Sequence, residues 1–258
     1  MLSEHAMTID YTRYYLKWHQ DTPEHRARMV EMYRRILAPF VPKDRDAHIL
    51  DVGCGMGFAL STLLSLGFQN IAGFDCDEGQ VRACKQAGLN VGLVESEQTI
   101  SYLRARPRTF DFILSLDVLE HIPNDTVLEV VSSISSALKP EGRFLCSVPN
   151  ANSAIAERWR YNDWTHHNSF TEHSLDFLLF NGGFGKIEIY PEEFLVRPKH
   201  AWLPVGGARH WWLFKFFRTW RRLEMMAELG PAQGRLVPLS LNLLATAENL
   251  VAPAGQGR

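Results

Sequence analysis

At 258 residues the chain is long enough to bury a full hydrophobic core as one domain. Hydrophobic residues make up 46% and charged residues 22%, which excludes a disordered composition. Lysine and arginine number 27 against 29 acidic residues, so the whole surface is not expected to attract nucleic acid. The first ten residues lack the apolar core of a signal peptide, and no stretch approaches the roughly 18 apolar residues of a membrane span. We therefore expect a soluble, cytoplasmic protein.

Helices and strands alternate along the first 150 residues. A helical segment at 24–38 ends before Pro39 and Pro42, which cannot continue a helix. Strands are then expected at 48–52, 71–75, 90–94, 110–114 and 142–148, and helices at 58–66, 78–86, 99–106 and 125–138. This order predicts βαβ units, a mainly parallel sheet with helices on both faces, and a ligand crevice at the carboxyl ends of the strands.

Beyond Pro149 the alternation stops. Polar and aromatic residues at 151–169 predict a long loop over the crevice. The elements that follow are a helix at 171–180, a strand at 185–190, and a last strand at 240–247. We expect one domain in five segments: a helical lid at 1–46, a ligand-binding core at 47–150, a loop over the crevice with a helix and sixth strand at 151–190, a helical insertion at 191–237, and the last strand and tail at 238–258.

A glycine-rich turn, Asp51-Val52-Gly53-Cys54-Gly55-Met56-Gly57, follows the first predicted strand. Glycine permits positive φ and lets a ligand approach the backbone. Asp75 ends the second strand 22 residues after Gly53, where a carboxylate can accept both hydroxyls of a ribose. The acid before the first glycine would repel the pyrophosphate of NAD, but it suits a ligand with an ammonium and a sulfonium. The pattern favours S-adenosyl-L-methionine, with a purely structural turn as the alternative.

Three motifs carry a family resemblance. They are Ile49–Gly55, Phe110–Ile113 followed by Leu116–Ile122, and Leu138–Arg143. Through them, residues 49–150 resemble the class I S-adenosylmethionine-dependent methyltransferases. The resemblance implies an α/β fold with a Rossmann-like, seven-stranded, mainly parallel sheet whose last strand is antiparallel. The seven strands expected above agree with it.

The resemblance also implies roles for residues at the donor site. Asp51, Gly53 and Gly55 line the donor, Asp75 holds the ribose, and Leu116 and Asp117 flank the methionine end. The family usually has an acid after strand three that contacts the adenine, but here the segment reads Glu95-Ser96-Glu97-Gln98, and Glu97 and Gln98 both stay open. The expected cofactor-binding set is Asp51, Gly53, Cys54, Gly55, Gly57, Asp75, Cys76, Gln98, Leu116 and Asp117.

The segment from Arg160 to Thr171, which reads RYNDWTHHNSFT, is similar to methyltransferases found with bacterial surface-polysaccharide and lipopolysaccharide genes. That resemblance implies O-methylation of a saccharide or glycoconjugate hydroxyl. An O-methyltransferase of another small molecule, such as a quinone-like compound or secondary metabolite, is the alternative enzyme. A non-catalytic donor-binding scaffold is the alternative outside enzymes, but it has no use for a histidine-bearing loop.

Histidines near this loop are candidates for a general base. A sugar hydroxyl is a poor nucleophile until a base takes its proton, and histidine titrates near neutral pH. His166 is the leading candidate, with His167 beside it and Asp163 to orient one of them; a structural role in closing the loop is the alternative. His121 competes from the end of the fourth strand, and His19 is a minor candidate. We expect no metal, because no cluster of His, Asp or Glu shows ligand spacing; the alternative is an ion held by His166, His167 and Asp163.

The sequence has three further features: an aromatic run near the N-terminus, an amphipathic segment at 208–223 and four cysteines. The aromatic and basic run Tyr11–His19 predicts a lid over the donor or an ordinary amphipathic helix. Within 208–223, apolar side chains share one helical face and cations lie elsewhere, which fits a lid packed on the domain, a dimer contact or a peripheral membrane contact. The four cysteines show no CxxC pair, so we expect reduced thiols in buried or helical segments: Cys54, Cys76, Cys84 and Cys146.

Overall fold

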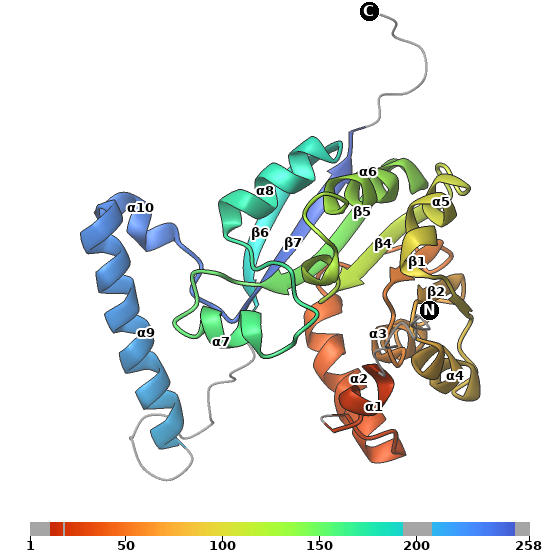
Figure 1. The fold of residues 1–258 in the computed structure, drawn as a ribbon, viewed down its shortest axis with the longest axis horizontal. Helices are drawn as coiled ribbons and strands as arrows, with labels where there is room; N and C mark the ends of the chain where they lie inside the picture. Colours follow the sequence, from red (N-terminus) through yellow and green to blue (C-terminus); the bar gives the residue numbers. More distant parts are fainter. Residues whose placement is uncertain (1–10, 18, 193–207, 251–258) are drawn as a thin grey trace, which may run out of the picture.

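The computed structural model describes residues 11–17, 19–192 and 208–250, and its strands form one seven-stranded sheet in the order β3-β2-β1-β4-β5-β7-β6 (Figure 1). The strands are β1 Ile49–Val52, β2 Ile71–Asp75, β3 Val91–Leu93, β4 Phe110–Leu116, β5 Leu138–Pro149, β6 Phe184–Glu192 and β7 Asn242–Asn249. β1 to β5 are parallel, whereas β7 is antiparallel to both β5 and β6. The expected Rossmann-like α/β sheet is therefore confirmed. Since β6 is antiparallel to β7, it runs in the same direction as β1, and its carboxyl end lies at the same edge of the sheet.

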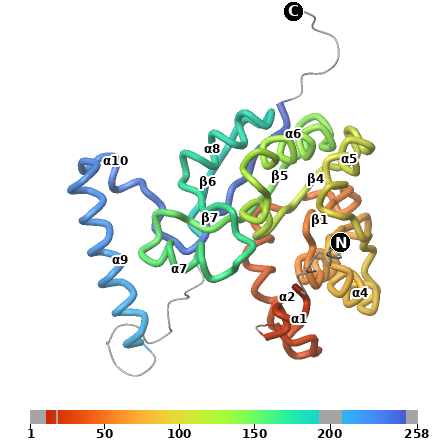
Figure 2. The backbone as a smooth tube through the Cα atoms, in the orientation of Figure 1, coloured from red at the N-terminus to blue at the C-terminus, as the bar shows by residue number. Residues whose placement is uncertain are grey.

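Helices flank the sheet. They are α1 Tyr11–Tyr15, α2 Pro23–Leu37, α3 Phe58–Ser65, α4 Glu78–Gln86, α5 Thr99–Arg104, α6 Val127–Ala137, α7 Ala156–Tyr161, α8 Glu172–Asn181, α9 Ala208–Leu229 and α10 Pro231–Leu236, with 3-10 turns η1 Ser96–Gln98 and η2 Leu119–His121. Figure 2 follows the chain through α5, α6 and α8 along one side of the sheet. The helices at 24–38, 58–66 and 78–86 and the strand at 71–75 are confirmed, with ends within one residue of the prediction.

Two hydrophobic layers enclose the sheet. Leu50 faces the layer that contains residues of α5, α6 and α8, whereas Ile49 faces the layer built by α2, α3 and α4. Neighbouring strand residues point to opposite faces, so a strand covered on both sides is apolar throughout. All four residues of β1 are buried. This double burial fixes the carboxyl ends of the central strands, where the glycine turn begins.

Several boundaries differ from the prediction, most of all that of β5, which begins at Leu138 rather than Gly142. The preceding helix ends at Ala137, and Leu138 already has extended backbone, with ψ 143°. Pro140 disfavours helical backbone at Lys139, the residue before it. The expected loop at 151–169 was also wrong in part, since it contains α7. The Trp159 indole of α7 donates to Asn242 Oδ1 at 2.9 Å, which anchors this helix to the start of β7.

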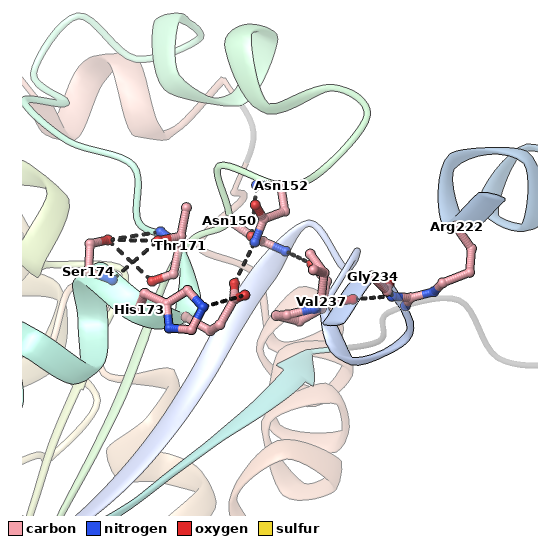
Figure 3. Close-up of polar contacts among 10 residues, drawn as sticks. Asn150, Asn152, Thr171, His173, Ser174, Arg222, Gly234 and Val237 are labelled. Atoms are coloured by element: carbon pink, nitrogen blue, oxygen red, sulfur yellow. Dashed lines mark hydrogen bonds and ion pairs between the residues drawn. The ribbon is translucent and has the colours of Figure 1, made fainter. Parts of the chain in front are cut away.

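Helix α8 begins with a capping box. Thr171 Oγ1 accepts from the Ser174 backbone N–H at 3.2 Å, and Ser174 Oγ accepts from the Thr171 N–H at 2.9 Å (Figure 3). The serine hydroxyl thus does what glutamate does in the usual capping box. This reciprocal pair fixes where α8 starts after residues 160–171.

The insertion forms a helical hairpin of α9 and α10 beside the sheet (Figure 1). Arg222 Nη1 donates to the carbonyls of Gly234 at 2.8 Å and Val237 at 2.6 Å, which ties α9 to α10 (Figure 3). The other face of α9 carries four aromatic side chains that are 40% to 64% exposed: Trp212, Phe216, Phe217 and Trp220. Residues 193–207 of the predicted insertion lie outside the described residues. None of the helices in the described ranges is long and apolar enough to cross a membrane.

Candidate active site

The glycine turn carries the chain from β1 across the end of β2. The backbone N–H groups of Gly53 and Cys54 both donate to the Phe74 carbonyl at 3.0 Å. Gly53 has φ +70°, and a Cβ there would lie 2.5 Å from the Val118 side chain, so only glycine fits. The Gly55 N–H donates to Asp75 Oδ2 at 2.8 Å. The turn and the acid at the end of β2, predicted as partners, therefore lie in contact.

Carboxylates gather at this edge of the sheet: Asp51 is buried, Asp75 is half-buried, and Asp117 is exposed as a residue but turns its carboxyl toward Ser147 and Asn242. Asp51 is 2% exposed, and its Oδ2 has no hydrogen-bond partner among the described residues. Burial, with Asp75 nearby, raises the Asp51 pKa to about 8. Asp117 accepts at Oδ1 from Ser147 Oγ at 3.0 Å and Asn242 Nδ2 at 2.9 Å, and burial raises its pKa. Buried carboxylates without a paired cation suit a cationic ligand, because binding would offset their desolvation.

Comparison with known proteins identifies this arrangement. A family model described as "Methyltransferase domain" matches residues 6–189. The chain belongs to this methyltransferase family. Its sheet is that of the class I, S-adenosylmethionine-dependent methyltransferases, and its donor is S-adenosylmethionine.

Curated relatives match the methyltransferase over about two fifths of its length. The Ubiquinone biosynthesis O-methyltransferase of Serratia proteamaculans is 29% identical over 112 residues, which are 42% of this chain and 45% of the relative. The enzyme of that name from Nitrosococcus oceani is 34% identical over 105 residues, 40% of this chain and 43% of the relative. The chain thus aligns with less than half the length of these relatives.

Solved structures share the fold across most of the chain. A SAM-dependent methyltransferase from Archaeoglobus fulgidus superposes with a TM-score of 0.64 at 21% identity, over 93% of this chain and 100% of that one. An S-adenosylmethionine-dependent methyltransferase from Mesorhizobium loti gives a TM-score of 0.54 at 16% identity, over 84% of this chain and 98% of that one. At these identities the likeness establishes the fold alone.

The residues at the glycine turn fit the donor of a methyltransferase. Asp51 keeps a buried oxygen without a partner, and the space beside Gly55 is open, since a Cβ there would meet only the Gln80 side-chain oxygen at 3.0 Å. A ligand with an ammonium, a sulfonium and two ribose hydroxyls matches this set of acids. The roles expected for Asp51, Asp75 and Asp117 at the donor therefore remain predictions with supporting geometry.

Other members of the expected donor set lie in varied surroundings. Cys54 and Cys84 are buried, and the Cys54 side chain packs against Gly73 in the core, so Cys54 can offer only its backbone to a ligand. Cys76 is exposed, which corrects the expectation that every cysteine is in a buried or helical segment. Glu97 and Gln98 are both exposed in η1, and the choice between them for adenine stays open. Gly57 is the left-handed N-cap of α3.

Helix α1 packs against the donor side of the site. The Thr12 backbone N–H donates to Asp77 Oδ2 at 3.2 Å, and the Thr12 hydroxyl also bonds to this carboxylate. Gly79 permits the approach, since a Cβ there would lie 2.4 Å from Thr12 Oγ1. Tyr15 is enclosed near Asp117 and Asp75, and burial raises its pKa. His19 stacks on Tyr15 at 4.3 Å, which places it with the donor-side aromatics.

A chain of hydrogen bonds joins the segment at 160–171, which we call the acceptor segment, to η2. Thr165 Oγ1 donates to Asp163 Oδ1 at 2.6 Å, so the same hydroxyl oxygen accepts from His121 Nδ1, 2.8 Å away. His121 thus carries its proton on Nδ1 and leaves Nε2 with a lone pair. Burial, followed by the neighbouring His166, lowers the His121 pKa to about 4. The structure therefore brings Asp163 to His121, rather than to His166, through Thr165.

The two other candidate histidines differ in position. The His166 ring lies edge-on to that of His121, with centroids 4.6 Å apart. Its side chain bonds to the Trp159 backbone, its Nδ1 is buried without a partner, and burial lowers its pKa. His167 has an exposed side chain, and its backbone N–H donates to the Glu120 carbonyl at 2.7 Å. His121 and His166 are therefore the pair that the fold brings together.

Glu120 lies beside this histidine pair. It is 1% exposed, its Oε2 has no partner, and burial raises its pKa. One ligand atom from each of Glu120, His121 and His166 lies within 4.8 Å of the others, close enough to meet a metal ion. This grouping escaped the sequence analysis because His166 follows His121 by 45 positions. Metal-independent transfer stays a prediction.

Sequence reasoning missed Glu192, at the carboxyl end of β6. It is 8% exposed, its Oε2 has no partner in the part of the chain that the structure describes, and burial followed by Asp117 raises its pKa to about 8. The Asn242 side chain bonds to it and to Asp117. The sequence holds one signal for this residue: an acid follows a strand that runs in the same direction as β1.

Proposed function

We propose that this methyltransferase transfers a methyl group to an acceptor hydroxyl, with the His121–His166 pair as general base. The observation that carries the proposal is the Asp163–Thr165–His121 chain of hydrogen bonds. S-adenosylmethionine supplies a methyl group that is already activated on a sulfonium, so the displacement mainly needs positioning. The remaining task is to take the hydroxyl proton.

Both histidines are suited to accept that proton. His121 is fixed with its lone pair on Nε2, and His166 keeps a buried Nδ1 without a partner. Their lowered pKa values keep both rings neutral near pH 7. His166 was the leading candidate from sequence, and the bonded chain now favours His121 as the oriented member. Asp163 and Thr165 act as positioning residues.

The acceptor that fits best is a quinone-like phenol. A neutral imidazole whose pKa lies near 4 is a weak base, so it matches an acidic hydroxyl. Phenols ionise near pKa ~10, as tyrosine does, well before a sugar hydroxyl. The likeness to ubiquinone O-methyltransferases supports the same class.

A saccharide or glycoconjugate hydroxyl is the second candidate acceptor. Its support is the resemblance of residues 160–171 and two exposed aromatic rings in that segment. Trp164 is 96% and Tyr161 is 77% exposed, and such faces can stack on a sugar ring. A panel of catechol-type phenols and glycans, assayed with labelled donor, distinguishes the two classes.

Substitution of the two histidines tests the base. The variant that removes the acting base, His121→Gln or His166→Gln, should lower turnover by ~10²-fold, while its donor affinity stays unchanged. His173→Gln is the control, since its side chain is 79% exposed on α8. Wild-type turnover should fall on acidification with a midpoint below the ordinary histidine value of about 6.5, because both pKa values are lowered. Near-normal turnover in both variants would eliminate the base assignment.

A further inference from the structure

Among the described residues, three buried carboxylates in the site each have an oxygen without a hydrogen-bond partner: Asp51 Oδ2, Glu120 Oε2 and Glu192 Oε2. Their exposed fractions are 2%, 1% and 8%. Burial of an ionised carboxylate without a partner is unfavourable in free energy, so such a group either stays protonated or binds a cation. The motifs of the sequence account for Asp51 and Glu120. Glu192 lies outside those motifs and has no role so far.

Glu192 lies where the donor side and the acceptor segment meet. Asn242 is the link, because its Nδ2 donates to Asp117 Oδ1 at 2.9 Å and its side chain also bonds to Glu192. Asn242 Oδ1 accepts from the Trp159 indole of α7 at 2.9 Å. The amide is therefore fixed from both sides and holds Glu192 beside Asp117. Methyl transfer must take place between these two regions.

We propose that Glu192 is the counter-charge of the donor's methylsulfonium and gives up its proton to solvent as the donor binds. The inference rests on the proposed function and on the prediction that Asp117 flanks the methionine end of the donor. The donor carries an ammonium, a sulfonium and a carboxylate, whereas its demethylated product has lost the sulfonium charge. A neutral carboxyl thus becomes a carboxylate paired with sulfonium. Once the sulfur is a thioether, the carboxylate has no partner and takes up a proton again.

The surroundings of Glu192 agree with a proton-bearing carboxyl in the unliganded chain. Asp117 after β4, Glu120 of η2 and Tyr33 of α2 face it, and Asn242 of β7 bonds to it. Burial and Asp117 raise its pKa to about 8, whereas the Asn242 bond lowers it. At pH ~7, below that pKa, the carboxyl is mostly protonated. A nearby cation reverses this balance.

Calorimetric titration of the full chain measures the released proton. S-adenosylmethionine and S-adenosylhomocysteine are each titrated at pH ~7 in buffers of different ionisation enthalpy, which gives the proton count for each ligand. The wild type should release about half a proton or more in excess with S-adenosylmethionine. Glu192→Gln should abolish this excess and weaken S-adenosylmethionine binding about tenfold or more, while affinity for the product changes less than about twofold. Glu188→Gln is the matched control, on the same strand but exposed.

Two results would overturn the proposal. One is an equal proton count for the two ligands in the wild type, which needs no variant to fold. The other is a folded Glu192→Gln protein that binds S-adenosylmethionine as the wild type does. Asp51 also has a pKa of about 8 and can release a proton of its own, so the assignment depends on the difference between wild type and variant. Failure of the wild type to bind the donor would instead refute the donor site.

Discussion

Replacing Asp51 by asparagine removes a titrating group from the donor site with little change of shape. Asp51 is 2% exposed, and its pKa rises from 3.8 to about 8 in the folded chain. A carboxyl with a raised pKa binds its proton more tightly when folded. Its contribution to stability is therefore complete below about pH 3.8 and is lost as the pH rises to about 8. The asparagine variant lacks this loss.

The size of the effect follows from linkage. Between these two pH values the wild type loses about 1.4 kcal/mol of unfolding free energy per pH unit through Asp51. The difference in unfolding free energy, Asp51→Asn minus wild type, should therefore rise by about 1.4 kcal/mol per unit from pH ~5 to pH ~8 and then level off. Urea unfolding of both proteins, without donor, at each of these pH values measures the slope.

The pH dependence of this free-energy difference is more informative than its absolute value. Asparagine brings an N–H₂ group to a place where Asp51 Oδ2 has no partner, which shifts the whole curve by a constant amount. Asp46→Asn serves as the control, because Asp46 is exposed just before β1. If the unfolding free energies of Asp51→Asn and wild type have the same dependence on pH, Asp51 is solvated or ion-paired. It would then not belong to a cluster of carboxylates that binds a cation.

The remaining predictions concern the ribose, metals and α9. Asp75→Ala should weaken calorimetric donor binding by roughly 1–3 kcal/mol, the loss for hydrogen bonds to a charged group; unchanged affinity would contradict the ribose assignment. Transfer should survive EDTA, and activity lost to EDTA but restored by magnesium would mean that the cluster of Glu120, His121 and His166 holds an ion. The double variant Trp212→Asp, Phe216→Asp should abolish self-association, measured by light scattering, or liposome binding, measured by flotation. If the variant behaves as the wild type in both assays, the aromatic face of α9 is exposed to solvent in the wild type.

The donor-binding half of the fold could be predicted because its signals are local. Strand β2 at Ile71–Asp75 and helix α4 at Glu78–Gln86 have the predicted bounds, since Asp77 caps the helix and a glycine follows it. Helix α7 could not be predicted in the same way. Its sequence is polar and aromatic without helical periodicity, and the Trp159–Asn242 bond that anchors it joins residues 83 positions apart. Tertiary contact, rather than propensity, decides such a segment.

The residues of the site also fall into two groups, those that a local motif predicts and those that only the fold brings together. The glycine turn and Asp75 follow a motif within 25 residues, from Asp51 to Asp75, so both could be found by reading. Thr165 was read only as part of a motif, because its partner His121 lies 44 residues away. Asn242 bonds to both Glu192 and Asp117, and the fold brings it to Asp117 from 125 positions away. Sequence can place an acid at the end of a strand, but the contacts between strand ends come from the topology of the sheet.

Helix α1 links the two sides of the site with neighbouring residues. Thr12 bonds to Asp77 at the start of α4, while the Tyr11 hydroxyl donates to Asp163 Oδ2 at 3.2 Å. The helix has five residues, of which Tyr11 and Tyr15 are half-buried and lie against the rings of His121 and His19. These ring contacts and the bonds to the two carboxylates together hold it in place. Asp163 also accepts from Thr165, which positions His121. Any displacement of α1 removes a partner from the donor side and from the chain that orients the base, so the two halves of the site are joined through this one short helix.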